Sequence, residues 1–237
     1  MFKKIKIIIQ ITIVVLIIIS FGYYIYSDYQ KSKTLKDTKS ETIEQISNLD
    51  FTNQTDQDIK QETIGEYKES FNTQAEIFIN DSENPKSFWA LIEIAQIKEL
   101  FEDYDGAKQA LLWAIDLEPK SYLANGNLAH LYFRHYNDFA KAEEFFLKAI
   151  ESDSVQVATY YYDLHEIYRY FYKQDTGLAE DILKQGIEKY PKEIDLMFSL
   201  ARYYEDMNRK DEAKEYYIKI LEINPDSQIA KQKLEDI

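Results

Sequence analysis

The stretch IDLMFSLARYYEDMNRKDEAKEYYIKILEINPD, residues 194–226, decides the fold of this chain. In its second half, apolar residues stand at i, i+3, i+4, i+7 and i+8 from Ala213, which is the pattern of one face of an α-helix. Pro225 then ends the pattern, because proline cannot continue a helix. The first half predicts another helix, whose apolar face comprises Met197, Leu200, Ala201 and Tyr204. The stretch therefore predicts two helices joined by a short turn at 208–211.

The second of these helical patterns occurs three more times upstream. The copies begin at Ala107, Ala142, Ala179 and Ala213, at spacings of 35, 37 and 34 residues. Three copies end on a proline, at Pro119, Pro191 and Pro225, and the remaining copy has Ser154 at the equivalent place. A period of this length is typical of stacked helical repeats. The additional residues of the third copy are expected between its two helices, at 170–177.

These residues resemble the tetratricopeptide repeat, whose pattern has a large residue, Leu, a small residue, Tyr, Ala, an aromatic, Ala and Pro at fixed offsets. The resemblance covers 86–226 and implies an all-α fold, an α-solenoid of about four helix pairs. Residues 227–237 are expected to form a C-terminal capping helix. Residues 56–85 carry an apolar stripe without the repeat signature and predict an amphipathic helix or a degenerate repeat that covers the first pair. His165 departs from the family pattern, because it stands where a small residue is usual.

The amino-terminal region differs in composition from the repeats. Residues 7–26 are almost entirely apolar and are long enough, at about 1.5 Å per residue, to span a bilayer as a transmembrane helix. A basic tail at 1–6 precedes this segment, and a polar tether at 27–55 follows it. We interpret 7–26 as an uncleaved signal anchor. The alternative is a cleaved signal peptide with Ser20-Phe21-Gly22 as its cleavage site.

Positive charge does not decide the orientation of this segment in the membrane, because lysines flank both of its ends. A short basic tail is more easily kept in the cytoplasm than a long domain is. We therefore predict a single-pass membrane protein with its repeat domain on the extracytoplasmic side.

The charge of the chain limits the classes of partner. The net charge is −14, and residues 1–40 carry seven lysines against two aspartates, which leaves −19 for the remainder. A domain this acidic is poorly suited to bind nucleic acid. The chain has no cysteine, and it shows no metal-binding, nucleophile or phosphate-loop motif. We therefore expect no enzyme activity, no metal and no cofactor, and the oligomeric state is left open.

In the family, the first helices of the pairs line a concave groove, and the resemblance carries its positions onto this chain. The groove candidates are Trp89, Ile92, Gln96, Leu123, His130, Phe133, Arg134, Tyr162, Glu166, Arg169, Phe198, Arg202 and Glu205. Aromatic residues and arginines suit a peptide-binding groove. The alternative for the arginines is local pairing, of Arg169 with Glu166 and of Arg202 with Glu205, each three residues apart.

The chain is therefore predicted to be a membrane-anchored scaffold that binds a protein or peptide partner in its groove, in assembly or trafficking at a bacterial envelope. The alternative is an accessory or regulatory subunit of a membrane enzyme complex.

Overall fold

The computed structural model describes residues 40–41, 43–51, 61–81, 85–152 and 157–237. The chain divides into two compact units, Met1–Leu49 and Asp50–Ile237. In the first unit, residues 43–47 are helical. The predicted tail at 1–6 and the predicted membrane helix at 7–26 lie outside the described residues. None of the helices in the described part is both long enough and apolar enough to cross a membrane.

The described part of the second unit is built from helices, and the predicted all-α fold is confirmed. The elements are α2 (Gln61–Asn80), α3 (Pro85–Leu100), α4 (Tyr104–Leu117), α5 (Tyr122–Leu131), the π-helical turn η1 (Tyr132–Tyr136), α6 (Phe139–Ile150), α7 (Ala158–Tyr170), α8 (Leu178–Lys189), α9 (Ile194–Asp206), α10 (Lys210–Ile223) and α11 (Gln228–Asp236).

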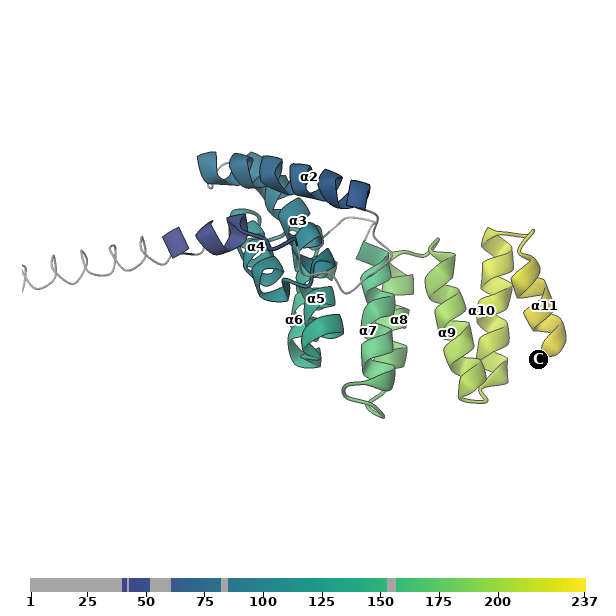
Figure 1. Cartoon of the computed structure of the whole chain (residues 1–237). Helices are drawn as coiled ribbons and strands as arrows, with labels where there is room; N and C mark the ends of the chain where they lie inside the picture. The colour runs from purple at the N-terminus through teal and green to yellow at the C-terminus, as the bar shows by residue number, and fades with distance from the viewer. Residues whose placement is uncertain (1–39, 42, 52–60, 82–84, 153–156) are drawn as a thin grey trace, which may run out of the picture. The chain divides into compact units, whose positions relative to one another are not determined.

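The helices pack in sequential pairs, as Figure 1 shows for α7 to α10. The pairs are α3 with α4, α5 with α6, α7 with α8, and α9 with α10. Each pair also packs on the next one, through α4 with α5, α6 with α7, and α8 with α9. At the two ends of the series, α2 packs on α3 and α11 packs on α10. The result is a solenoid in which each pair contacts its neighbours along the chain.

Short polar side chains start several of these helices. Asp103, Ser121, Asp138 and Ser227 precede α4, α5, α6 and α11, and each accepts a hydrogen bond from a backbone N–H in the first turn. Such caps satisfy amide groups that the helix itself leaves unpaired. The helix starts are therefore encoded locally.

The prolines act in two different ways. Pro119, Pro191 and Pro225 each stand two residues beyond the end of a helix, at α4, α8 and α10. Pro85 is instead the first residue of α3, and α2 already ends at Asn80. The element predicted at 56–85 therefore does not extend to Pro85. At the first position of a helix the missing N–H costs nothing, and the fixed φ of proline suits the helix.

Small residues lie at the contacts between helices, as their position in the repeat predicts. Ala107, Ala142, Ala179 and Ala213 are all buried. Gly126 on α5 is also buried, and a methyl group at this position would collide with the ring of Tyr160 on α7. The second and third pairs therefore approach closely at this point.

The third pair has the long connection that its spacing predicts. Residues 171–177 join α7 to α8, and Lys173, Asp175 and Gly177 adopt positive φ. His165 is buried beneath this connection, and its Nδ1 lies 2.7 Å from the carbonyl oxygen of Ala179. The imidazole thus links α7 to α8 by a polar contact, where the family pattern has a small residue.

The first pair contains a buried charge. Lys98 of α3 is fully buried, and its Nζ lies 2.6 Å from Oδ2 of Asp103. The same carboxylate caps α4 through the N–H of Gly106. Burial lowers the pKa of Lys98, although its hydrogen bond and its charge interaction with Asp103 act in the opposite direction. One aspartate therefore fixes both the turn and the helix that follows it.

Candidate functional site

Two pockets open along the helices that come first in each pair. The N-terminal pocket lies among α2, α3 and α5, and the C-terminal pocket lies among α7, α9 and α11. Helices α7 and α9 also contact each other directly, so the first helices form a continuous row in this half. These pockets are the candidate site.

The N-terminal pocket has a volume of about 760 Å³. Its lining residues are Glu66, Tyr67, Ser70, Trp89, Ile92, Glu93, Gln96, Ile97, Leu100 and Leu123. Trp89 is 65% exposed, whereas Ile92 and Ile97 are buried and form an apolar floor. The two charged groups of the lining, Glu66 and Glu93, are both carboxylates.

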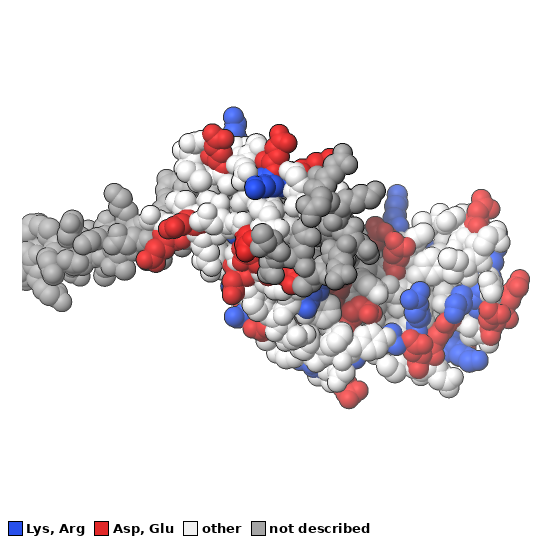
Figure 2. Space-filling model, in the orientation of Figure 1, with Lys and Arg blue, Asp and Glu red and all other residues white. Residues whose placement is uncertain are grey.

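The C-terminal pocket has a volume of about 660 Å³. Its lining residues are Ala158, Thr159, Tyr162, Glu193, Asp195, Leu196, Phe198, Ser199, Arg202 and Ile229. Tyr162 is 39% exposed and Ile229 is 63% exposed, so the pocket presents both aromatic and aliphatic surface. Figure 2 shows basic and acidic side chains interspersed over the C-terminal helices. The pocket itself is mixed in charge, because Glu193, Asp195 and Arg202 all line it.

Arg202 is the basic residue in the lining of the C-terminal pocket. It is exposed and forms no salt bridge with any described residue. Burial raises the pKa of Tyr162 and the Glu166 carboxylate raises it further, whereas the charge of Arg202 lowers it. The guanidinium of Arg202 therefore lies close enough to the phenol of Tyr162 to affect its pKa. The N–H donors of Arg202 remain available to a ligand.

Between the two pockets lies a half-buried pair of titratable groups, His130 of α5 and Asp163 of α7. His130 Nε2 lies 3.5 Å from Asp163 Oδ2, and Phe146 and Tyr160 place their rings against the imidazole. Burial lowers the pKa of His130 to about 4, and the charge of Arg134 acts in the same direction. Burial raises the pKa of Asp163 to about 6, against the opposing charge of Arg134. At pH 7 the histidine is therefore neutral and the carboxyl group is ionised.

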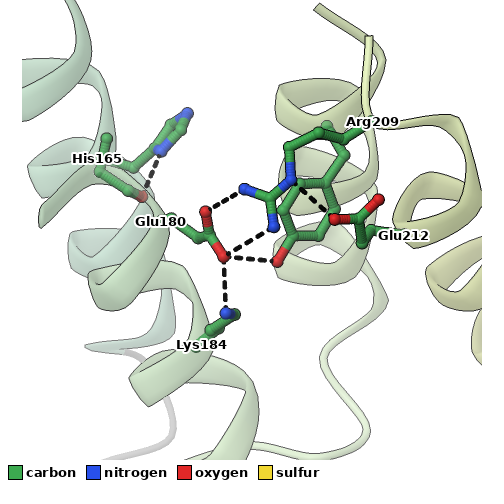
Figure 3. Close-up of polar contacts among 7 residues, drawn as sticks. His165, Glu180, Lys184, Arg209 and Glu212 are labelled. Carbon is green, nitrogen blue, oxygen red and sulfur yellow. Dashed lines mark hydrogen bonds and ion pairs between the residues drawn. The ribbon is translucent and has the colours of Figure 1, made fainter. Parts of the chain in front are cut away.

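A polar network joins α8 to the fourth helix pair (Figure 3). Glu180 of α8 accepts hydrogen bonds from Tyr204 of α9, from Lys184 on its own helix and from Arg209 at the start of α10. Burial raises the pKa of Glu180, but the hydrogen bonds from Arg209, Lys184 and Tyr204 outweigh it and lower the pKa to about 2. Arg209 is shared with Glu212. The network fixes α8 against the fourth pair and so supports α9, which lines the pocket.

With this geometry in place, the chain can be compared with known proteins. One model of the tetratricopeptide repeat matches residues 194–227, and another matches residues 101–156. The uncharacterized protein ycf37 of Cyanophora paradoxa is 30% identical over 156 residues, which span 62% of this chain and 89% of that protein. The chain belongs to the tetratricopeptide repeat proteins.

Other similar proteins match a shorter part of the chain or share less of its sequence. The tetratricopeptide repeat protein 8 of Mus musculus is 35% identical over 83 residues, which span 35% of this chain and 15% of the mouse protein. The crystal structure of MamA superimposes with a TM-score of 0.53 at 21% identity, and covers 74% of this chain and 95% of that one. PilW, described as a type IV pilus biogenesis factor, gives 0.51 at 18% identity, with 73% and 80% covered. At such identities the two structures show the fold alone.

The predicted groove residues of this tetratricopeptide repeat protein fall into separate groups. Trp89, Ile92, Gln96 and Leu123 line the N-terminal pocket, and Tyr162, Phe198 and Arg202 line the C-terminal pocket. The remaining candidates, His130, Phe133, Arg134, Glu166, Arg169 and Glu205, line neither of these pockets. Seven of the thirteen candidates therefore line one of these two pockets.

Two candidates lie on the π-helical turn η1. Phe133 contacts Phe139 and Phe171, and these rings form a cluster at the end of the second and third pairs. Arg134 is exposed and forms no salt bridge within the described residues. The repeat pattern assumes a regular α-helix and did not predict this turn.

The local pairing of the arginines was predicted wrongly. Arg169 of α7 binds Asp206 of α9, with 2.6 Å between Nη2 and Oδ2, rather than Glu166. Glu205 binds Lys233 of α11 and accepts a hydrogen bond from Tyr217. Both contacts join different helices, because partners on adjacent helices can come as close as partners one turn away. Arg169 and Glu205 therefore help to hold the stack.

The sequence did not single out the residues that the two end helices contribute. Glu66, Tyr67 and Ser70 come from α2, and Ile229 comes from α11. Tyr67 and Ile229 belong to apolar stripes, which by themselves predict packing and not a pocket.

Among the described residues, no group of three or more His, Cys, Asp or Glu side chains is placed to hold a metal ion. The pockets instead combine aromatic surface, apolar floor and a few charges. Such lining is suited to a peptide or to the surface of a protein partner.

Proposed function

We propose that this protein is a scaffold that binds a protein or peptide partner along its row of first helices. The observation that supports this most is the presence of two open pockets on that row, with Trp89 and Tyr162 exposed in them. Large aromatic side chains are costly to leave in water and contribute strongly to binding when a partner covers them. No catalytic step is part of the proposal.

The test is capture of partners by the full chain and by a variant with Tyr162→Ala and Phe198→Ala. Both residues line the C-terminal pocket, so their truncation is expected to lower affinity by about 1–2 kcal/mol each. Ile218→Ala is a matched control, because Ile218 is an exposed apolar residue of α10 that lies outside both pockets. Equal recovery of every partner by the two variants would contradict the proposal.

We also propose that residues 7–26 anchor the repeats to a membrane, with the repeat domain on the extracytoplasmic side. Support comes from the sequence, in the apolar run and its flanking lysines. An anchor would raise the local concentration of the binding face near membrane-bound partners, for example in assembly or trafficking at a bacterial envelope. Carbonate extraction of membranes tests the anchor, and protease treatment of intact cells tests the side. Release of the protein by carbonate would overturn the anchor. Protection of the repeats from protease in intact cells would overturn their extracytoplasmic location.

A further inference from the structure

We propose that the N-terminal pocket binds a cationic side chain, a lysine or arginine of the partner, with Trp89 as its aromatic contact. This inference rests on the proposed scaffold function and assigns a chemistry to one of its two pockets. It is carried by three features of the pocket, which are an exposed indole, two carboxylates and an apolar floor.

The indole of Trp89 is presented to solvent at the pocket. It is 65% exposed, and Phe88 contacts it edge-on, with ring centroids 5.2 Å apart. Phe88 is itself buried, so this contact fixes one side of the indole against the core. The face of an indole is the best aromatic partner for a cation, because its π-electrons make it negative. Tyr67 of α2 adds a second ring to the lining.

The charges of the pocket have one sign. Glu66 of α2 and Glu93 of α3 line the pocket, and the described residues of the lining include no Lys or Arg. Neither glutamate forms a salt bridge with a described residue. The hydroxyl of Ser70 donates a hydrogen bond to Oε1 of Glu93, which holds this carboxylate in place and leaves its other oxygen available. A cation that enters the pocket therefore meets negative charge that nothing else in the lining neutralises.

The spacing along α3 brings these groups to one face. Trp89, Glu93 and Gln96 stand at i, i+4 and i+7, which places them in a row along the helix. Ile92 and Ile97 form the floor beside them. A long side chain with an apolar stem and a charged end matches this arrangement, because the stem can cover the floor while the charge reaches the carboxylates.

The comparison with the C-terminal pocket supports the choice of ligand. That pocket also has an aromatic wall, but Arg202 contributes a positive charge to its lining. A neutral apolar ligand would suit either pocket. A cation is favoured in the N-terminal pocket, and an acidic residue is repelled there.

The test is an NMR titration of the full chain with two small probes, Nα-acetyl-lysine methylamide and Nα-acetyl-norleucine methylamide. The probes share the stem and differ in the charge. Trp89 and Trp113 are the two tryptophans, so a Trp89→Phe variant assigns the indole N–H signal of Trp89. We expect the lysine probe to shift this signal and to bind roughly threefold to thirtyfold more tightly than the norleucine probe.

A double variant Glu66→Gln with Glu93→Gln is expected to remove most of this preference. The control is Glu188→Gln with Glu222→Gln, which removes the same charge from exposed positions outside both pockets. Equal binding of the two probes, or an equal loss of preference in the control, would overturn the inference. If the two probes bind equally but the variant with Tyr162→Ala and Phe198→Ala loses its partners, only the cation site is refuted. The proposed scaffold function then stands.

Discussion

The two pockets of this protein are built from equivalent helices but differ in charge. Trp89 on α3 and Tyr162 on α7 belong to first helices and are both exposed in a pocket. Around Trp89 the charged lining is acidic, whereas around Tyr162 it includes Arg202. The repeat pattern therefore places the two pockets on equivalent helices, and residues outside the pattern set the charge of each lining.

The supports behind the two pockets differ as well. In the first pair, the fully buried Lys98 forms a salt bridge with Asp103. In the third and fourth pairs, Glu180 is shared among Arg209, Lys184 and Tyr204. A buried ion pair is more sensitive to the loss of one partner than a partly exposed network, because burial raises the cost of the charge that remains. The predictions that follow test this contrast, from the largest expected effect to the smallest.

Asp103→Ala is expected to destabilise the protein by about 3–5 kcal/mol, because it removes both the carboxylate that pairs with the buried Lys98 and the cap of α4. Urea unfolding followed by circular dichroism measures the loss. Lys98→Met is the control, since it replaces the buried charge by an apolar side chain of similar length and is expected to cost far less. Equal losses in the two variants would mean that the charge is not the cause.

Asp163→Asn is expected to make stability depend more strongly on pH. The lowered pKa of His130, about 4, destabilises the fold as pH falls from 6.5, because the unfolded chain binds the proton more tightly. The raised pKa of Asp163, about 6, has the opposite effect, since the contribution of this carboxyl to stability is lost as pH rises from 3.8. The two effects oppose each other in the native protein.

The variant should therefore lose about 2–3 kcal/mol between pH 6.5 and pH 4 relative to the unmodified chain, in thermal melts at a series of pH values. His130→Gln is the matched control and should show the opposite slope. If both variants keep the pH dependence of the unmodified chain, the buried pair does not titrate as inferred.

Glu180→Gln is expected to cost about 2 kcal/mol at pH 7, because the hydrogen bonds from three partners to a charged carboxylate are weakened. The pKa of Glu180 is lowered to about 2, so its contribution is present above its ordinary pKa of 4.5 and is lost as pH falls through 2. The difference in unfolding free energy between variant and unmodified chain should shrink over that range. Glu212→Gln, which touches only Arg209 of this network, should cost less. A difference that stays constant down to pH 2 would rule out this account.

Arg202→Ala is expected to have the smallest effect, a loss of about 1 kcal/mol in affinity for an acidic partner at the C-terminal pocket and none in folding. Arg134→Ala is the control, because Arg134 is also exposed and without a salt bridge among the described residues, but lines neither pocket. The affinity for the acidic partner should change less between low and high salt for the Arg202 variant than for the control. Identical affinities in the two variants would remove Arg202 from the site.

Much of the fold follows from short-range pattern. The buried alanines at 107, 142, 179 and 213, the prolines after α4, α8 and α10, and the long connection at 171–177 all agree with the sequence. These features depend on periodicity, on backbone dihedrals and on the missing N–H of proline, and each acts within a few residues. Pro85 shows the limit, because the same residue can follow one helix or open the next.

The candidate site was predicted only in part, for a reason that Glu66, Arg169 and Ile229 illustrate. Glu66 joins Trp89 in one pocket, Arg169 binds Asp206, and Ile229 joins Tyr162 in the other pocket. Each contact joins helices that are far apart in the chain, so no local spacing encodes it. The sequence by itself determined the paired helices of the repeats. The tertiary structure decided which charges meet on that face, because charge pairing depends on distances through space that only the packed helices set.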